Sequence, residues 1–348
     1  MKLRVGLVGL GDQWAVRHAP ALRALSDRFE ISAVCSEVAE KSQRVASEFE
    51  AVATDGFRAL LQRDDVDALL LLSPEWYGHL PIQAACAAGK PVYSTASLDC
   101  TPEQAVEVRR DIRASRVPFM AELPLRYAPA TIRLKELIAT RLGKPRLLFC
   151  HRRLPLESQS DRLRRGKHCP LVWRNMMELV DWCRYIVAAD PESIVSSAHG
   201  NHNGNVETYY QMASLDFRSC QPSAESPNQS PIRPLAQLSV GHYIPQQWSD
   251  ALSFRRPAAL QICCEKGMAF VDLPSSLVWF NDAGQHTESL DAERAIGEMM
   301  LVRFHRLVTN TLANSTDAHD ADCAMKIVLA ANKSIETGDR IQLSFNQD

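Results

Sequence analysis

Short apolar runs alternate with segments of helical spacing over the first third of the chain. The apolar runs, which predict buried strands, are Arg4–Gly9, Ile31–Cys35 and Ala68–Leu72. The segments of helical spacing, which predict helices, are Val16–Arg28, Ala39–Phe49 and Leu80–Ala88. Strands that alternate with helices are typical of βαβ units. Residues 1–122 are therefore predicted to form a doubly wound parallel sheet with helices on its faces.

The order of elements changes after about Pro124. The pattern then predicts helices at Ala130–Ala139 and Leu171–Val187, a strand at Arg146–Arg152, and several strands between Ile194 and Phe280. This succession is typical of an α+β domain with a mostly antiparallel, open sheet. We therefore expect residues 123–348 to form a second domain. Two further helices, at Glu293–Leu312 and Asp320–Thr337, are free to pack back on the first domain.

The composition agrees with two ordinary globular domains. A chain of 348 residues is long for one core and fits two domains of ~150 to 200 residues. Apolar residues make up 46% of it and the net charge is −2, which gives no general attraction to nucleic acid or to an anionic membrane. The ten cysteines include no C-x-x-C pair, so we expect no metal site, no disulfide framework and a reducing, cytoplasmic location. The leucine-rich run Ala68–Leu72 is far too short to span a membrane.

Two glycines mark a candidate dinucleotide site. Gly9 and Gly11 follow the first strand and lead into a helix, a context in which glycine lets the backbone approach a pyrophosphate at the helix N-terminus. The third glycine of the usual motif is absent, and Trp14 stands in its place. An indole there would push the helix away unless the turn is one residue longer. Close packing of strand and helix without a ligand is the alternative explanation for the glycines.

The end of the second strand bears on the choice of cofactor. Dinucleotide-binding folds usually carry an acidic residue there, which binds the ribose hydroxyls. In this chain Ser36 holds that position and Glu37 follows it. A carboxylate repels the 2′-phosphate of NADP, and no arginine lies beside it, so the sequence favours NAD without excluding NADP. A solvated surface position is the alternative for Glu37.

Further motifs complete a family pattern. Asp65–Pro74, His79 and Ala87–Val92 are followed by Arg126–Pro129 and Leu142–Pro145. With the two glycines, these stretches resemble the glucose-fructose oxidoreductase and inositol dehydrogenase family (Gfo/Idh/MocA) over residues 1 to about 190, and in general pattern beyond. The resemblance implies a Rossmann domain that holds NAD(P), an α/β domain that frames the substrate, and hydride transfer to or from a sugar-like small molecule.

The motifs and the resemblance also indicate which residues form the two sites. The residues expected to bind the cofactor are Gly9, Leu10, Gly11, Asp12, Gln13, Trp14, Ser36, Glu37, Ser73, Pro74, His79 and Thr95. The residues expected to bind the substrate are Arg126, Arg152, His168, Trp173, Arg174 and Asp181. Because the open sheet often forms the subunit interface in this family, we also expect a homo-oligomer, either a dimer or a tetramer.

The usual catalytic residues of the family are exchanged in this sequence. A Glu-Lys-Pro sequence normally follows the strand that ends near Tyr93, and here the matching places are Thr95–Ser97. The family also carries an Asp and a His four residues apart near the start of a helix, with a second Asp three residues later. The first two places match Arg174 and Glu178, and only the last acid is retained, as Asp181.

Two explanations of Glu178 remain open. Arg174 and Glu178 are spaced i, i+4 on the predicted helix, so they can form a structural ion pair. Alternatively, Glu178 acts as the catalytic base in a site formed with Trp173 and Arg174. The function accordingly has two candidate classes. One is an oxidoreductase with a replaced acid-base apparatus, and the other is a catalytically silent dinucleotide-binding sensor or regulatory protein.

Positive charge is concentrated in the segment before that helix. It contains His151–Arg153, Arg162, Arg164–Arg165 and Lys167–His168. Arginines bind carboxylates and phosphates through paired hydrogen bonds, so the segment favours an anionic substrate such as a sugar acid or a sugar phosphate. A solvated basic loop is the alternative. Nucleic acid is disfavoured as a partner, because no aromatic residues are interleaved with the charges.

Overall fold

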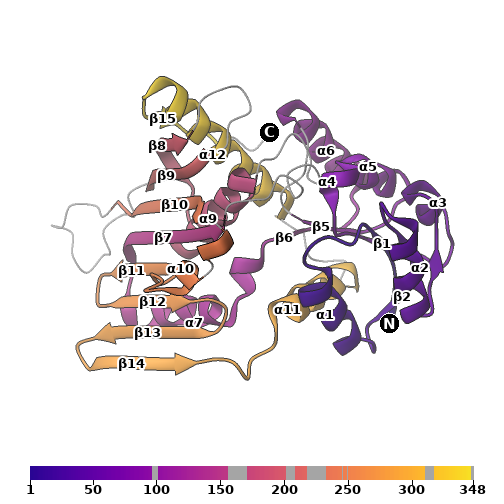
Figure 1. Cartoon of the computed structure of the whole chain (residues 1–348), viewed down its shortest axis with the longest axis horizontal. Coiled ribbons are helices and arrows are strands. Elements are labelled where there is room, and N and C mark those ends of the chain that lie inside the picture. Colours follow the sequence, from indigo (N-terminus) through magenta and orange to yellow (C-terminus); the bar gives the residue numbers. More distant parts are fainter. Residues whose placement is uncertain are drawn as a thin grey trace. The chain divides into compact units, whose positions relative to one another are not determined.

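Two units make up the chain (Figure 1). The computed structural model describes residues 1–95, 101–155, 171–200, 208–217, 233–244, 246–248, 250–309 and 317–345. The first unit contains Met1–Pro124 and Arg294–Asp322. The second contains Leu171–Glu293 together with the stretches that begin at Leu125 and at Cys323. The first unit is therefore built from parts of the sequence that are far apart.

The first unit contains a six-stranded parallel sheet in the order β3-β2-β1-β4-β5-β6. Its strands are β1 (Leu3–Val8), β2 (Phe29–Cys35), β3 (Val52–Ala53), β4 (Ala68–Leu71), β5 (Val92–Thr95) and β6 (Phe119–Glu122). Its helices are η1 (Trp14–His18), α1 (Ala19–Ala24), α2 (Ala39–Glu48), α3 (Phe57–Leu61), α4 (Pro74–Tyr77), α5 (Leu80–Ala87), α6 (Pro102–Ser115) and α11 (Ile296–Thr309). This is the order of a dinucleotide-binding sheet, and the predicted doubly wound parallel sheet is confirmed.

Strand β4, at the centre of the sheet, is apolar along its whole length because helices cover both faces of the sheet. All four residues of β4, with the sequence ALLL, are buried, and Leu69, Leu70 and Leu71 are at most 1% exposed. Continuous apolar strands of this kind are typical of parallel sheets with both faces covered. The resulting core keeps the sheet rigid, so that the loops at the carboxyl ends of its strands have fixed positions.

The second unit contains a nine-stranded mixed sheet. Its strands are β7 (Pro145–Pro155), β8 (Pro191–Gly200), β9 (Thr208–Phe217), β10 (Leu235–Ile244), β11 (Leu260–Cys264), β12 (Met268–Asp272), β13 (Ser276–Asn281), β14 (Gly284–Ser289) and β15 (Ile341–Gln342). Its helices are α7 (Pro129–Leu137), η3 (Ile138–Leu142), α9 (Leu171–Val187), η4 (Gln246–Trp248), α10 (Asp250–Ser253) and most of α12 (Asp317–Thr337), while η2 (Pro124–Tyr127) begins at the division between the units.

One face of this sheet packs against helices. The order is β14-β13-β12-β11-β7-β10-β9-β8-β15, and every pair is antiparallel except β7 with β10. The mostly antiparallel sheet predicted for this part of the chain is thus confirmed. Alternate residues of the strands join one buried core with residues of α7, α9 and α12 (Figure 1). The opposite face carries large apolar side chains that are 36–41% exposed, namely Leu147, Met212, Leu235, Met268 and Phe280.

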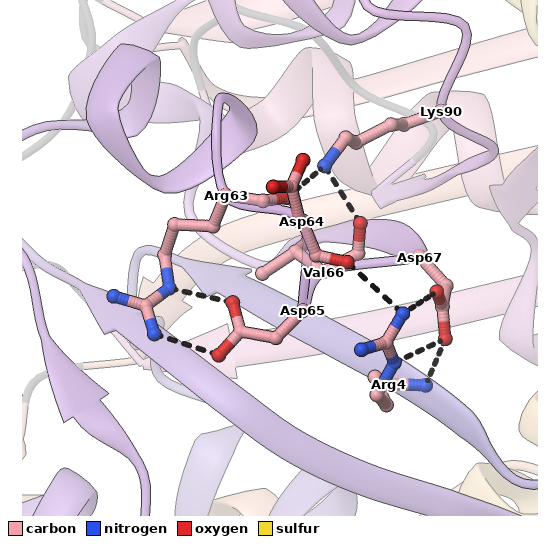
Figure 2. Close-up of polar contacts among 7 residues, drawn as sticks. All are labelled: Arg4, Arg63, Asp64, Asp65, Val66, Asp67 and Lys90. Atoms are coloured by element: carbon pink, nitrogen blue, oxygen red, sulfur yellow. Dashed lines mark hydrogen bonds and ion pairs between the residues drawn. The ribbon is translucent and has the colours of Figure 1, made fainter.

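An ion-pair network joins the amino ends of β1 and β4 (Figure 2). The Arg4 side chain donates two hydrogen bonds to Asp67, from Nε at 3.1 Å and from Nη2 at 2.7 Å, and the Arg4 backbone N–H donates a third at 2.9 Å. Lys90 Nζ donates to the carbonyl oxygens of Arg63 at 2.7 Å and Val66 at 2.6 Å. The polar residues of two family motifs, Asp65–Pro74 and Ala87–Val92, therefore contribute structural contacts at the edge opposite the carboxyl ends of the strands.

Replacing Lys90 with methionine should lower the free energy of unfolding by about 1 to 3 kcal/mol. The substitution removes a charged donor from two carbonyl groups while keeping an unbranched apolar stem of similar length. Urea denaturation would measure the change. Lys2→Met is the matched control, because Lys2 forms an exposed pair with Glu30 at 3.6 Å. This substitution should cost less than about 1 kcal/mol. Equal effects of the two variants would contradict a structural role for Lys90.

Candidate functional site

The two glycines lie where the loop after β1 meets the end of β4. Gly9 has a φ of +76°, in the left-handed region that favours glycine. A Cβ atom at Gly9 would lie 2.3 Å from Cβ of Ser73, and one at Gly11 would lie 2.6 Å from the carbonyl oxygen of Leu72. Both glycines are therefore needed for the loop to lie on the end of β4. Close packing thus accounts for them, and it also holds their backbone at the edge where such folds bind a pyrophosphate.

The helix after this loop begins with a widened turn. In η1 the His18 N–H donates to the carbonyl oxygen of Gln13, five residues earlier, at 3.2 Å. A turn of this π type contains one residue more than an α-helical turn. The Trp14 ring packs edge-on against Phe49, with 5.9 Å between ring centroids. The longer turn that the sequence requires around an indole is therefore present. Gln13, at the N-cap, makes no side-chain hydrogen bond to the helix, which leaves this helix start suited to an anion.

Ser36 and Glu37, just after β2, have different partners. The Ser36 N–H donates to Ser42 Oγ at 2.8 Å, so Ser36 stabilises the turn into α2. Glu37 Oε1 accepts a hydrogen bond from Lys41 Nζ at 3.1 Å. Its second oxygen, Oε2, is buried and has no hydrogen-bond partner among the described residues. Buried polar atoms normally have partners, so an open acceptor at this strand end fits the hydroxyl donors of a ribose.

The remaining predicted cofactor residues follow β1, β4 and β5. Leu10 is buried and Asp12 is exposed. Ser73 is 2% exposed and lies under the glycine loop. Pro74 begins α4, His79 precedes α5, and Thr95 is the last residue of β5. The structure thus places the predicted set at the carboxyl ends of the parallel strands or in the loops that follow them. Together with the helix start at Gln13 and the open oxygen of Glu37, this arrangement fits a dinucleotide.

A buried charged cluster near these residues was not predicted from the sequence. Glu122 is the last residue of β6 and is in register with Thr95. Its carboxylate accepts hydrogen bonds from Arg17 and from His18 Nε2, the latter at 3.0 Å. His18 is 2% exposed and Glu122 is 5% exposed. Burial alone would raise the pKa of Glu122, but the contacts with His18 and Arg17 outweigh burial and lower this pKa to about 2.

In the second unit, Arg126 and Asp181 form a buried ion pair. Arg126 Nε donates to Asp181 Oδ2 at 2.7 Å, and Arg126 Nη2 donates to Oδ1. The Asp181 side chain is 2% exposed and the Arg126 side chain 13%. The guanidinium of Arg126 also lies 5.2 Å from the centroid of the Tyr185 ring. Two residues predicted to contact the substrate are therefore bound to each other, and their role in substrate binding stays a prediction.

Glu178, on α9, pairs with a residue of β7. Arg152 Nη1 donates to Glu178 Oε2 at 2.7 Å and to Asn175 Oδ1 at 2.6 Å. The partner of this carboxylate is thus Arg152, where the helical spacing suggested Arg174. Trp173 is partly buried and packs against the core of the unit. His168, together with the loop after Thr95 and the basic segment from Arg162, lies outside the described residues.

Metal sites and membrane spans were searched for in the described part of the chain. No group of three or more His, Cys, Asp or Glu side chains among these residues is placed to hold a metal ion. No helix there is both long enough and apolar enough to cross a bilayer.

Residues 3–121 match a family model described as "Oxidoreductase family, NAD-binding Rossmann fold" (GFO_IDH_MocA). A dTDP-3,4-didehydro-2,6-dideoxy-alpha-D-glucose 3-reductase from Actinomadura kijaniata is 34% identical over 108 residues, which are 30% of this chain and 31% of the reductase. A D-xylose 1-dehydrogenase (NADP(+)) from Hypocrea jecorina is 29% identical over 126 residues, 34% of this chain and 32% of that enzyme. The match thus spans about a third of these relatives.

Solved structures share the fold over the whole chain. An aldose-aldose oxidoreductase from Caulobacter crescentus superposes with a TM-score of 0.81 at 13% identity, covering 99% of this chain and 100% of that one. A putative myo-inositol dehydrogenase from Sinorhizobium meliloti gives a TM-score of 0.75 at 16% identity, with coverage of 99% and 100%.

The match bears on two predictions from the sequence. It confirms the family resemblance for residues 3–121, whereas the exchange of the catalytic residues stays a prediction. The expected NAD cofactor agrees with an NAD-binding family, and the NADP-dependent relative is consistent with NADP as the alternative. Residues 3–121 of this chain therefore match the NAD-binding Rossmann model of the Gfo/Idh/MocA oxidoreductase family.

Proposed function

We propose that the protein is a nicotinamide-dependent oxidoreductase that acts on a sugar-like small molecule. The observation that carries the proposal is the glycine loop packed on the end of β4, followed by a helix start without a side-chain cap. In this arrangement the backbone of Gly9–Gly11 and the first turn of η1 bind the pyrophosphate. A nicotinamide bound there would supply the hydride chemistry, while the protein contributes binding, orientation and electrostatics.

We assign the adenosine ribose to Glu37 and prefer NAD to NADP. The buried, open Oε2 of Glu37 accepts a hydrogen bond from a ribose hydroxyl. The same carboxylate would repel a 2′-phosphate placed there. The adjacent Lys41 is already bonded to Oε1 at 3.1 Å, so it reduces the negative charge of Glu37 without replacing the acceptor.

Glu37→Gln should weaken NADH binding by about 3- to 10-fold, because a charged acceptor for the ribose becomes neutral. NADPH binding should not weaken to the same extent, since the substitution also removes the repulsion of the 2′-phosphate. Calorimetric titration with each cofactor would measure the ratio of the two dissociation constants. Glu40→Gln is the matched control, because Glu40 is exposed one turn further along α2. An unchanged ratio in Glu37→Gln would contradict the assignment.

We infer a sugar-like substrate, and an anionic one in particular. The relatives named above are a dTDP-sugar reductase, a D-xylose dehydrogenase and an aldose oxidoreductase. Arg152, on β7, is one of the basic residues of the predicted substrate segment, and its guanidinium is bonded to Glu178 and Asn175. Both of these bonds use Nη1. Arginine binds carboxylates and phosphates through geometry-specific hydrogen bonds, so the other N–H groups of Arg152 support a sugar acid or sugar phosphate.

A cofactor titration followed by a turnover screen tests the function. Calorimetry first measures NADH binding to the folded protein. NADH-linked turnover is then compared for neutral sugars, such as D-glucose, D-xylose and myo-inositol, and for D-glucuronate and glucose 6-phosphate. Turnover supports the oxidoreductase, and faster turnover of the charged sugars supports the anionic class. NADH binding without any turnover favours the silent sensor, and no NADH binding contradicts both.

We further propose that the exposed face of the second sheet joins copies of the chain into a homo-oligomer. Its apolar side chains, with Leu147, Leu235 and Phe280 among them, are each at least 36% exposed. Contiguous apolar surface of this kind is typical of subunit interfaces. Light scattering on the purified protein would give the oligomer size, and a monomer would contradict the proposal.

A further inference from the structure

His18 has one ring nitrogen bound and one open. Its Nε2 lies 3.0 Å from Glu122 Oε2. Its Nδ1 is buried and has no hydrogen-bond partner among the described residues. Leaving a polar atom buried without a partner costs stability, and such atoms are rare in folded proteins. An unpaired ring nitrogen therefore suggests a position that a ligand completes.

The neighbours of His18 fix which tautomer it adopts. Glu122 is ionised, since its contacts hold its pKa near 2, so it can only accept hydrogen bonds and the proton of the imidazole lies on Nε2. Arg17 also bonds this buried carboxylate, so Glu122 has a cationic partner apart from the imidazole. In the tautomer with a single proton on Nε2, Nδ1 of His18 carries the lone pair.

The cluster lies at the edge of the sheet that carries the candidate cofactor site. Glu122 is the last residue of β6 and is in register with Thr95. His18 is the last residue of η1, the helical turn that follows the glycine loop. The Tyr93 ring stands edge-on to the imidazole, with 6.5 Å between centroids. An aromatic edge beside the imidazole limits its rotation, so the direction of the lone pair is set by Glu122 on one side and Tyr93 on another.

We propose that His18 Nδ1, oriented by Glu122, accepts a hydrogen bond from an N–H or O–H donor of the bound ligand. The inference rests on the proposed function, because it assumes that a ligand binds at this edge. Two sources offer the donor, the carboxamide of the nicotinamide and a hydroxyl of the substrate. With either donor, His18 would be a ligand-binding residue of the first unit that was not predicted from the sequence.

Two amide variants separate this role from a structural one. Asparagine can place an amide oxygen near the position of Nδ1, while glutamine reaches the position of Nε2 and can still donate to Glu122. The proposal predicts that His18→Gln folds and binds ligand about 3- to 10-fold more weakly, whereas His18→Asn binds more tightly than His18→Gln despite a lower melting temperature. If His18 had only a structural role, the less stable variant, His18→Asn, would bind the ligand more weakly than His18→Gln.

Calorimetry with matched probes identifies the donor. If the carboxamide donates, the wild type binds NADH more tightly than reduced 3-acetylpyridine adenine dinucleotide, which lacks that N–H group, and His18→Gln loses this preference. If a substrate hydroxyl donates, NADH binding is unchanged and the binding of D-xylose or D-glucuronate to the NADH complex weakens. Unchanged binding of all probes in His18→Gln overturns the inference alone. Failure of the wild type to bind NADH overturns the proposed function and the inference with it.

Discussion

Glu178→Gln should lower kcat by about 10²- to 10⁴-fold, the range that general acid-base catalysis contributes, if the protein turns over a sugar as proposed. The substitution keeps the size and one acceptor oxygen of the side chain but removes its ability to take a proton. Glu178 Oε2 is held by Arg152 at 2.7 Å, and Oε1 has no hydrogen bond within the described chain. The side chain is 28% exposed, so Oε1 remains open to a substrate hydroxyl.

A comparison of two variants distinguishes a base from a positioning residue. If Glu178 is the base, Glu178→Gln should lower kcat far more than a variant that keeps the carboxylate and only removes the group that orients it. Arg152→Met is the matched variant, because it removes the partner of Glu178 while keeping the carboxylate. If kcat is unchanged in Glu178→Gln, Glu178 is not the base, and the ligand-facing nitrogen of His18 becomes the first position to test.

Arg126→Met should lower the free energy of unfolding by about 3 kcal/mol or more, because it leaves the buried carboxylate of Asp181 without its closest cation. Asp181 is 2% exposed and receives two hydrogen bonds from Arg126. Arg184 also lies near it, with Nη1 3.8 Å from Oδ1. The longer contact cannot replace a bidentate one, so we expect the lower end of the 3 to 5 kcal/mol usual for broken buried pairs.

A double-mutant cycle isolates the pair. Combining Arg126→Met with Asp181→Leu removes both charges, and this variant should recover much of the lost stability, since apolar replacements of buried ion pairs are often neutral. Arg23→Met serves as the exposed control, because Arg23 and its partner Glu48 have side chains that are 56% and 39% exposed and should contribute less than about 1 kcal/mol. Urea denaturation measures the wild type, Arg126→Met, Asp181→Leu, the double variant and Arg23→Met. A loss in Arg126→Met no larger than in Arg23→Met would show that the pair does not stabilise the unit.

Local pattern was enough to predict the strands β1, β2 and β4 and the helices α9 and α12, but not α6. The apolar run at β4 reflects burial on both faces of the strand, and the helical spacing of α9 reflects burial on one face of the helix. Each kind of burial leaves a recognisable pattern in the sequence. The helix predicted at Leu171–Val187 has the bounds found in the structure. The widened first turn of η1 corresponds to the longer turn that the sequence offered as one way to accommodate the Trp14 indole.

Partners that are far apart in the sequence could not be predicted in the same way. His18 and Glu122 are 104 residues apart, and neither has a neighbour in the sequence that indicates the other. The available signals were an acidic residue at the end of the apolar strand FMAE and a histidine on a helix, and both are common in exposed positions. Glu178 shows the same limit: its spacing from Arg174 allows a helical pair, but a strand residue, Arg152, provides the contact that forms.

The first unit is assembled from distant parts of the chain, and this affects how it folds during synthesis. Tyr93, on β5, is fully buried, with its hydroxyl 3.8 Å from Met300 Sδ and its ring 5.6 Å from that of Phe304. Both partners belong to α11, which leaves the ribosome about 200 residues after Tyr93. The Rossmann sheet must therefore wait, with part of its core exposed to chaperones, until nearly the whole second unit has been translated. A fragment that stops at Pro124 would keep that apolar surface uncovered, so an isolated cofactor domain would need α11 attached through a linker.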